Sequence, residues 1–164
     1  MRVIWITGLP GVGKSSVARE LATRLRSDGE PCVLLDGDTL RDALAPLRTG
    51  YDEDTRRAFA HSYAHLAAIV ASQHVTAVVA TVSLFAEVHR ANRTRFARYL
   101  EVMLVCDDAE RERRRPAATL EGPRHSIEIA PEFPNEAHLV LSSDDARPSE
   151  LAARILERWR NIDG

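Results

Sequence analysis

Residues Gly8–Ser15 constrain the fold of this chain more than any other segment. They read GLPGVGKS and match the pattern G-x-x-x-x-G-K-S/T at every fixed position. The segment follows an apolar run at Val3–Ile6 and precedes a stretch of helical periodicity, which is the strand–loop–helix context that the pattern requires. Glycines in such a loop let backbone N–H groups turn around a phosphate chain, and the helix start adds the positive end of its dipole. The pattern therefore predicts a phosphate-binding loop, or P-loop.

The two residues that close the pattern carry its chemistry. Lys14 is expected to neutralise the β- and γ-phosphates of ATP, and the Ser15 hydroxyl is expected to bind Mg²⁺. The alternative is a plain glycine turn, but such a turn needs no Lys-Ser pair, and Lys14 is the only lysine of the chain. ATP and Mg²⁺ are therefore the predicted cofactors. The expected nucleotide-binding residues of this segment are Gly8, Leu9, Pro10, Gly11, Val12, Gly13, Lys14, Ser15 and Ser16.

Strand-like apolar runs alternate with helical patterns along the whole chain, which predicts an α/β fold. The run at Ala77–Val82 is almost wholly apolar, as expected for a strand that is covered on both faces in a parallel sheet. We expect a three-layer P-loop NTPase fold, with a mostly parallel five-stranded sheet, helices on both faces and a short lid. The expected strands are Val3–Ile6, Val33–Leu35, Ala77–Val82, Val102–Cys106 and Leu139–Leu141, and the expected inner helix stripes are Val17, Leu21 and Leu25, then Phe59, Leu66 and Val70, then Leu151, Ile155 and Trp159.

Length and composition suit a single domain that spans residues 1–164. The chain has 164 residues, of which 45% are hydrophobic, and its net charge of −2 gives no basic excess for nucleic acid or an anionic membrane. No apolar run approaches the ~20 residues that cross a bilayer. Cys32 and Cys106 are too few for a disulfide scaffold, which favours a reducing compartment. We therefore expect a cytoplasmic protein that binds neither nucleic acid nor membrane.

Other features favour a small-molecule kinase over other P-loop proteins. A GTPase would normally read its base with Asn-Lys-x-Asp, which this chain cannot contain because it has one lysine. Motor ATPases and helicases would need a longer chain. An irregular stretch with four prolines between residues 116 and 134 suits a lid, spanning about 114–134, that excludes water from the acceptor. Arg114, on the lid side, is expected to contact ATP.

A second chemical signal is the acidic turn Asp36-Gly37-Asp38, which lies between the second expected strand and a helix. The carboxyl ends of parallel strands form the ligand crevice, so both aspartates should face the phosphates. A kinase that acts on a hydroxyl needs one carboxylate to accept or orient the proton and others to hold hydrated Mg²⁺. The alternative is that Asp38 only caps the following helix.

With these motifs together, the chain resembles the adenosine 5′-phosphosulfate (APS) kinases along most of its length. Their pattern is a P-loop, then Leu-Asp-Gly-Asp-Asn-Leu/Ile-Arg, then Gly-Phe/Tyr with an Asp-Arg pair, then Ile-Ser-Pro-Phe/Tyr. Further matches lead through the strand and helix before the lid. The matching segments are Leu35–Arg41, Gly50-Tyr51, Arg56, Val82-Ser83-Leu84-Phe85, Glu101-Val102, Arg114 and Pro116.

This resemblance implies that Asp38 is the catalytic base and that Lys14 offsets the charge that develops on the transferred phosphoryl group. It implies that Asp36 orders Mg²⁺-bound water or the substrate. Arginines would bind anionic groups of the acceptor, an aromatic ring would stack on its base, and a serine would line the pocket, where direct in-line transfer is favoured over a phosphoserine intermediate. The implied partner is a small anionic nucleotide-linked substrate, and the resemblance also allows a homodimer. The implied acceptor-binding residues are Asp36, Arg41, Tyr51, Arg56, Ser83 and Phe85.

Several positions depart from the APS kinase pattern, and most of them belong to acceptor contacts. Thr39 replaces the asparagine of the acidic turn, Thr55 replaces the aspartate of the Asp-Arg pair, and Leu84 replaces the proline. Phe59-Ala60-His61 stands in place of Asn-x-Arg, and Ala117-Ala118-Thr119-Leu120 stands in place of the lid signature Lys-Gly-Leu-Tyr. A site built for one polar substrate loses affinity steeply when its partners vanish. The phosphate machinery is thus kept, whereas the acceptor pocket differs.

Three functions follow from these observations. The first is transfer of the γ-phosphate of ATP to a hydroxyl, by resemblance a ribose 3′-hydroxyl, of APS or a related nucleotide-linked acceptor. The stretches Ser83–His89 and Tyr99–Val102 look more like a branch of the family that acts on other such acceptors, for example cytidine diphosphoramidate. The second is a P-loop kinase of a sugar, nucleoside or antibiotic hydroxyl. The third is a catalytically silent ATP-binding module, against which the intact Lys14, Ser15 and Asp38 argue.

Overall fold

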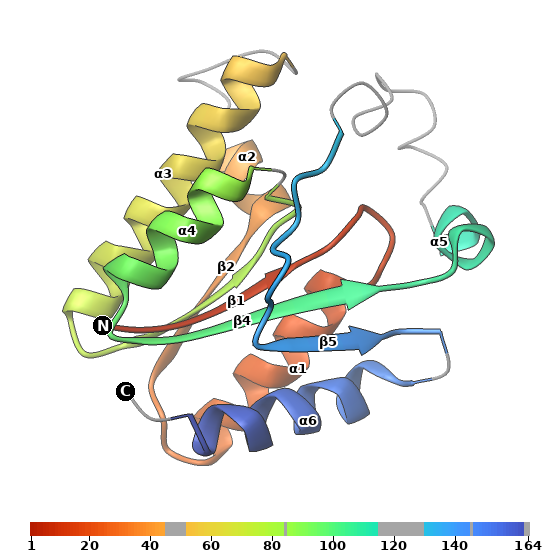
Figure 1. The fold of residues 1–164 in the computed structure, drawn as a ribbon. Coiled ribbons are helices and arrows are strands. Elements are labelled where there is room, and N and C mark those ends of the chain that lie inside the picture. The colour runs from red at the N-terminus through yellow and green to blue at the C-terminus, as the bar shows by residue number, and fades with distance from the viewer. Residues whose placement is uncertain (45–51, 84, 115–129, 145, 163–164) are drawn as a thin grey trace.

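The computed structural model describes residues 1–44, 52–83, 85–114, 130–144 and 146–162. Within these residues, five strands form one sheet in the order β2-β3-β1-β4-β5, and all neighbouring strands run parallel (Figure 1). Parallel neighbours need a crossover connection, and at least one helix follows each strand along the chain. The elements are β1 (Arg2–Thr7), α1 (Lys14–Ser27), β2 (Cys32–Asp36), α2 (Gly37–Leu44), α3 (Glu53–Ser72), β3 (Thr76–Ala80), α4 (Ala86–Arg95), β4 (Arg98–Val105), α5 (Asp108–Arg114), β5 (Leu139–Ser142) and α6 (Pro148–Arg160).

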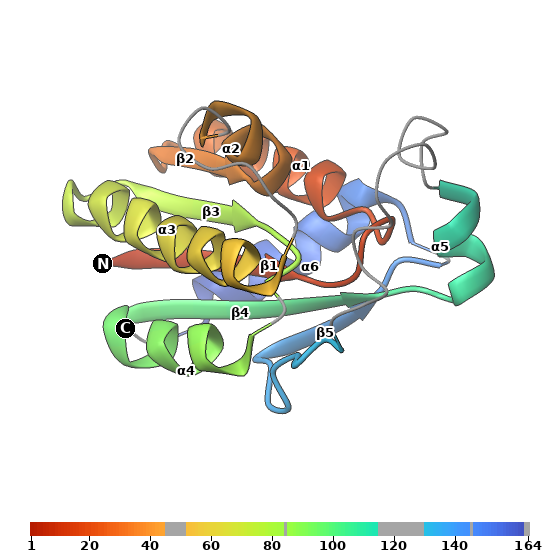
Figure 2. The ribbon, with the colours of Figure 1, turned by 90° about the horizontal axis from the view of Figure 1, so that it is seen from above.

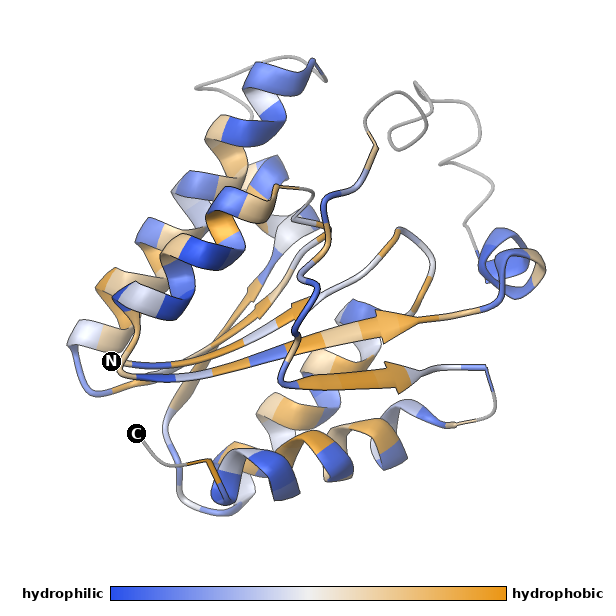
Figure 3. Ribbon diagram, in the orientation of Figure 1, coloured by the Kyte–Doolittle hydropathy of each residue, from blue (hydrophilic) through white to orange (hydrophobic). Residues whose placement is uncertain are grey.

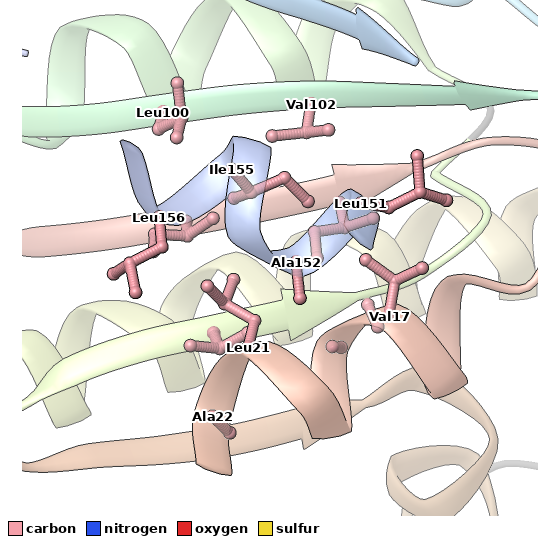
Figure 4. Packing of buried hydrophobic residues seen from close by; sticks show 14 of the residues in the cluster. Val17, Leu21, Ala22, Leu100, Val102, Leu151, Ala152, Ile155 and Leu156 are labelled. Carbon is pink, nitrogen blue, oxygen red and sulfur yellow. The ribbon is translucent and has the colours of Figure 1, made fainter. Parts of the chain in front are cut away.

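Helices cover both faces of the sheet, so the protein has three layers (Figures 1 and 2). On one face, α1 and α6 pack together against the strands through residues such as Leu21 and Ile155 (Figure 4). On the other face, α3 and α4 pack against Val3 and Trp5 of β1. Ile4, between these two residues, belongs to the opposite core, as the two-residue period of a strand requires. Strands that serve two cores must be mostly hydrophobic, which Figure 3 shows. The expected three-layer fold with a parallel sheet is confirmed.

The helix stripes agree with the sequence prediction for α1 and α6, whose predicted inner residues are all buried. The prediction for α3 is wrong in part. Phe59 is buried, but Leu66 and Val70 are only partly buried at the border of the core. The face of α3 that meets the sheet consists mainly of alanines, together with Tyr63. Small side chains let a helix approach the sheet closely, but they give little periodic signal, so the large residues Leu66 and Val70 indicated only the edge of the inner face.

All five strands differ from their predicted bounds, and two of them differ by more than one residue at one end. β3 ends at Ala80 rather than at Val82, because Val82 leaves the sheet and its carbonyl accepts a hydrogen bond of 2.8 Å from Thr7 Oγ1. β4 begins at Arg98 rather than at Val102, because Glu101 lies inside the strand and interrupts the apolar run. The first difference places the Val82 carbonyl at the carboxyl edge of the sheet, and the second places the Glu101 carboxylate within the sheet.

The described part of the chain contains neither a disulfide nor a membrane span. Cys32 is a buried free thiol, and Cys106 is a partly buried one. Among the described helices, none combines the length and the apolar character that crossing a bilayer requires.

Candidate active site

The P-loop lies at the carboxyl end of β1, the central strand, and leads directly into α1 (Figure 1). The Val17 N–H donates a hydrogen bond of 3.1 Å to the Gly13 carbonyl and so begins the helical pattern. The amides before Val17 therefore have no partner within the helix. Gly13 has a φ of 90°, which glycine adopts without strain, and the first turn of α1 contains no acidic residue. The loop thus presents N–H donors and a positive helix end, as an anion site requires.

Gly8 is needed where it stands because β4 passes close behind it. A Cβ atom on Gly8 would lie 2.4 Å from the Leu104 carbonyl oxygen. Its φ of 147° also lies in the region that L side chains rarely adopt. The first glycine of the motif therefore serves close packing of the P-loop on the sheet.

The Lys14 ammonium folds back onto the loop, where its Nζ donates a hydrogen bond of 2.8 Å to the Leu9 carbonyl. Burial lowers the pKa of Lys14 from 10.5 to about 8, although the carboxylates of Asp38 and Asp36 act in the opposite direction. The ammonium and both carboxylates therefore lie within electrostatic reach of one another. A phosphate chain in the loop would add negative charge close to this ammonium.

Asp36 and Asp38 have different roles at the start of α2. Oδ1 of Asp36, the last residue of β2, accepts hydrogen bonds from the backbone N–H groups of Asp38 at 3.1 Å and Thr39 at 3.4 Å. The cap that was an alternative role for Asp38 is thus provided by Asp36 instead. Asp36 Oδ2 is buried and has no hydrogen-bond partner among the described residues. The Asp38 residue is exposed, so a ligand can reach it.

The oxygen atoms in this region fit a magnesium ion. Mg²⁺ prefers hard oxygen ligands, keeps several of its waters, and binds through few protein groups together with substrate phosphates. The unpartnered Asp36 Oδ2 is such an oxygen, and Ser15 lies in the first turn of α1. The described residues contain no group of three or more His, Cys, Asp or Glu side chains that could hold a metal by themselves. The site therefore fits an ion that arrives with a phosphate chain.

Tyr63 connects α3 to the acidic turn. Its hydroxyl donates a hydrogen bond of 3.1 Å to the Gly37 carbonyl. Burial raises the pKa of Tyr63 to about 12, opposed by the Arg41 guanidinium and reinforced by the carboxylates of the turn. Arg41 also lies over the Phe59 ring, with its Cζ 4.8 Å from the ring centroid. Arg41 and the two aspartates thus share one neighbourhood, in which an acceptor with anionic groups could bind.

Two of the other predicted acceptor-binding residues lie near the starts of α3 and α4. Arg56 lies in the first turns of α3 and is partly exposed. Phe85 precedes α4 and is 3% exposed, and the Arg57 guanidinium lies 4.3 Å from the centroid of its ring. The ring is therefore almost wholly covered by the protein itself. Tyr51 falls outside the described residues, so its stacking on the acceptor base stays a prediction.

The loop after β3 is held at two consecutive carbonyl groups. Thr7 Oγ1 donates to the Val82 carbonyl at 2.8 Å, and Nε2 of His89 lies 3.0 Å from the Ser83 carbonyl oxygen. Ser83 has a φ of 37°, a left-handed conformation that is uncommon outside glycine. Ser83 is 5% exposed, and its hydroxyl has no hydrogen-bond partner among the described residues. A strained backbone and an unsatisfied buried hydroxyl together point to a functional position.

Sequence reasoning missed a charged group inside the sheet. Glu101 of β4 is fully buried and is hydrogen-bonded by His89 and Arg93 of α4. A signal for this group exists, because a glutamate inside an apolar run must find a partner. His89 and Arg93 are four residues apart and therefore lie on one face of a helix.

Arg114 ends α5 beside the loop that follows β5. Its guanidinium donates to Glu110 at 2.6 Å and to the Ser143 carbonyl at 2.9 Å. Residues 115–129 of the predicted lid lie outside the described residues, and 130–134 have no regular secondary structure. The contact of Arg114 with ATP stays a prediction.

Comparisons with known proteins agree with this architecture. The family model described as adenylylsulphate kinase matches residues 1–126. The cytidine diphosphoramidate kinase of Campylobacter jejuni is 33% identical over 105 residues, which cover 64% of this chain and 61% of that protein. The adenylyl-sulfate kinase of Paraburkholderia xenovorans is 34% identical over 167 residues, which cover 94% of this chain and 90% of that protein.

Solved structures lead to the same conclusion. The Mycobacterium tuberculosis APS kinase CysC in complex with AMPPNP and APS is 27% identical and superimposes with a TM-score of 0.85, covering 98% of each chain. A gluconokinase from Sinorhizobium meliloti, with 17% identity and a TM-score of 0.68, shares the fold. Since the family model covers most of the chain and the curated relatives named here are kinases, this chain belongs to the adenylylsulphate kinase family.

Proposed function

We propose that this kinase transfers the γ-phosphoryl group of ATP to a ribose 3′-hydroxyl of a nucleotide-linked acceptor, either APS or a related conjugate such as cytidine diphosphoramidate. The observation that carries the proposal is the convergence of Lys14, Asp36 and Asp38 at the carboxyl edge of the sheet. Phosphoryl transfer to an alcohol needs a cation that neutralises the phosphates and a carboxylate that accepts the hydroxyl proton. The three side chains provide both.

Each of these groups has a defined part in the proposed reaction. The P-loop amides and Lys14 bind the phosphate chain and offset the charge that develops during transfer. Ser15, together with water ordered on Asp36, would hold Mg²⁺, which supplies further neutralisation of the phosphate oxygens. Asp36 also fixes the start of α2 through its hydrogen bond to the Asp38 N–H. Asp38 is thereby held in place to accept the proton of the incoming hydroxyl.

The acceptor side supports an anionic conjugate and favours one other than APS. Arg41 lies near the two aspartates, and Arg56 lies on the adjacent α3. Thr55, which stands where APS kinases have an aspartate, directs its hydroxyl to the Asp52 carboxylate at 2.7 Å and so serves the start of α3. A polar contact of the APS kinase pattern is therefore absent. We infer that cytidine diphosphoramidate, the substrate named for one relative, is the stronger candidate of the two.

An assay with γ-labelled ATP and a panel of acceptors tests this proposal. The panel contains APS, cytidine diphosphoramidate, gluconate and shikimate, and ³¹P NMR of the product identifies the phosphorylated hydroxyl. We expect transfer to the nucleotide-linked acceptors and to their 3′-hydroxyl. Labelling of gluconate or shikimate alone would replace the proposal by a sugar-type kinase, and ATP binding without any transfer would replace it by a silent module.

A pair of variants on α2 tests the role of Asp38. Asp38→Asn should lower kcat by about 10²–10⁴-fold, because the amide cannot accept the proton. ATP binding, measured by calorimetry, should persist. Asp42→Asn is the matched control, since Asp42 is an exposed aspartate on the same helix. Equal rates for Asp38→Asn and Asp42→Asn would remove Asp38 from the mechanism.

A further inference from the structure

Glu101 is a fully buried carboxylate within β4, on the same face of the strand as Tyr99. Oε1 accepts hydrogen bonds from His89 Nδ1 at 2.8 Å and from the Tyr99 hydroxyl at 3.0 Å. Oε2 accepts two from Arg93, at 3.0 Å from Nε and at 2.5 Å from Nη2. Burial favours the neutral acid, but the hydrogen bonds outweigh it, so the pKa of Glu101 is lowered. The sheet therefore encloses a charged carboxylate.

His89 links Glu101 to the loop after β3. Its side chain is 3% exposed and lies between two acceptors, Glu101 Oε1 at 2.8 Å from Nδ1 and the Ser83 carbonyl at 3.0 Å from Nε2. A backbone carbonyl accepts hydrogen bonds and donates none, so Nε2 of His89 donates to Ser83, while Nδ1 faces the Glu101 carboxylate. Glu101 therefore orients the buried His89 ring through Nδ1, and the ring contacts the loop through Nε2.

The Ser83 backbone depends on such support. A left-handed conformation at a residue with a Cβ atom is strained and persists only where neighbouring contacts hold it. The hydrogen bond from His89 fixes the Ser83 carbonyl, and Thr7 fixes the preceding carbonyl of Val82. Fixing two consecutive peptide planes also fixes the direction of the Ser83 side chain, whose buried hydroxyl is unpartnered among the described residues.

This loop lies next to the acidic turn. In the sheet, Asp36 of β2 pairs with Ala80, the last residue of β3. A Cβ atom on Gly37 would lie 3.2 Å from Thr81 Oγ1, so the turn and the start of the loop after β3 are in close contact. An acceptor whose hydroxyl reaches Asp38 would therefore pass close to Ser83.

We propose that His89, oriented by Glu101, is a positioning residue that holds the Ser83 backbone so that the Ser83 hydroxyl binds the phosphoryl acceptor. The inference rests on the proposed function, because it takes the region beside Ser83 and the acidic turn to be the acceptor pocket. Neither Glu101 nor His89 touches the acceptor. They act by keeping Ser83 in a conformation that it would otherwise leave.

Three substitutions of His89 separate its two hydrogen bonds. In His89→Gln, the amide nitrogen replaces Nε2 and keeps the donor that faces Ser83, whereas in His89→Asn it replaces Nδ1 and keeps the donor that faces Glu101. His89→Leu keeps neither. We expect kcat/KM for the acceptor to fall at least about tenfold in the Asn and Leu variants and to be largely retained in the Gln variant. The dissociation constant for ATP should stay the same in all three.

Tyr99→Phe is the matched control. It removes a hydrogen bond to the same oxygen of Glu101 but makes no contact with Ser83. It should lower the thermal midpoint and leave kcat/KM for the acceptor unchanged. A purely structural role for His89 predicts instead that acceptor kinetics follow thermal stability across all four variants, and that result would overturn the proposal.

Hydrogen–deuterium exchange gives a readout that needs no acceptor. Peptides that contain Ser83 and end before His89 should exchange faster in His89→Leu and His89→Asn than in the wild type, His89→Gln or Tyr99→Phe. If the wild type phosphorylates neither APS nor cytidine diphosphoramidate, the proposed function fails, and the same exchange order still decides whether His89 holds this loop. Unchanged exchange in His89→Leu would refute the role of His89 even if the kinase activity is as proposed.

Discussion

Replacing Lys14 with methionine removes a partly buried charge but keeps a side chain of similar length and helix propensity. In the nucleotide-free protein, the pKa of Lys14 is lowered from 10.5 to about 8, mainly by burial. Such a shift corresponds to about 3 kcal/mol of differential interaction between the charged and neutral forms. Lys14 is partly exposed, and solvent reduces this value, so we expect Lys14→Met to raise the unfolding free energy near pH 7 by about 1–3 kcal/mol.

The effect depends on pH in a defined direction. Because the pKa of Lys14 is lower in the folded state, the unfolded chain binds more protons between about pH 8 and pH 10.5, and wild-type stability rises with pH across this window. The advantage of Lys14→Met is therefore largest below pH 8 and disappears towards pH 10.5. Binding of ATP should reverse the order at neutral pH, because the wild type gains the binding energy and the variant does not.

Urea denaturation of nucleotide-free protein at pH 7 and pH 10 measures this difference, and calorimetry measures ATP binding. Arg19→Met is the matched control, because Arg19 is an exposed cation on the same helix and its removal should change stability by less than about 0.5 kcal/mol. A Lys14→Met protein that is less stable than the wild type at pH 7, or a difference that does not vary with pH, would refute the reasoning. The first result would mean that the P-loop by itself stabilises the ammonium, and the second that folding leaves the pKa of Lys14 unchanged.

Two further predictions concern the same loop. Gly8→Ala should lower the unfolding free energy by about 2–4 kcal/mol, since the new methyl group would meet the Leu104 carbonyl at a strained φ. Gly29→Ala, at a φ of 79° with open space around it, should cost only about 1 kcal/mol, and equal losses in urea denaturation would contradict the packing argument. The affinity for ATP should be constant below about pH 7 and fall by up to about tenfold per unit above pH 8, because binding requires a protonated Lys14. Calorimetry in buffers of different ionisation enthalpy should then show proton uptake at pH 9, and a constant affinity from pH 7 to pH 9.5 would disprove this.

The parts of the fold that could be predicted from the sequence are those with dense patterns of large apolar residues. The stripes of α1 and α6 and the layered α/β order belong to this group. The inner face of α3 could be predicted only at Phe59, because four of its six buried residues are alanines, and alanine gives a weak hydrophobic signal. The start of β4 was missed because Glu101 resembles a strand boundary until its partners on α4 are known.

The candidate site, too, could be predicted from the sequence only in part. The P-loop could be placed because its chemistry is local and follows from one short motif. That Asp36 rather than Asp38 caps α2 could not be predicted, because it depends on the residue at which α2 begins. The contact between Ser83 and His89 depends on tertiary packing, and a backbone conformation such as the φ of Ser83 leaves no trace in a sequence pattern.

The order of the strands affects how such an enzyme can acquire a new substrate. β1 is the central strand, with β2 and β3 on one side of it and β4 and β5 on the other. Along the chain, α2 and α3 follow β2, α5 follows β4, and α6 follows β5. The departures from the APS kinase pattern at Thr39, Thr55 and Phe59–His61 all fall on α2 and α3. Natural selection, or a designer who exchanges side chains on α2 and α3 between relatives, can therefore change the contacts with one ligand while β1, α1 and the P-loop between them are inherited intact.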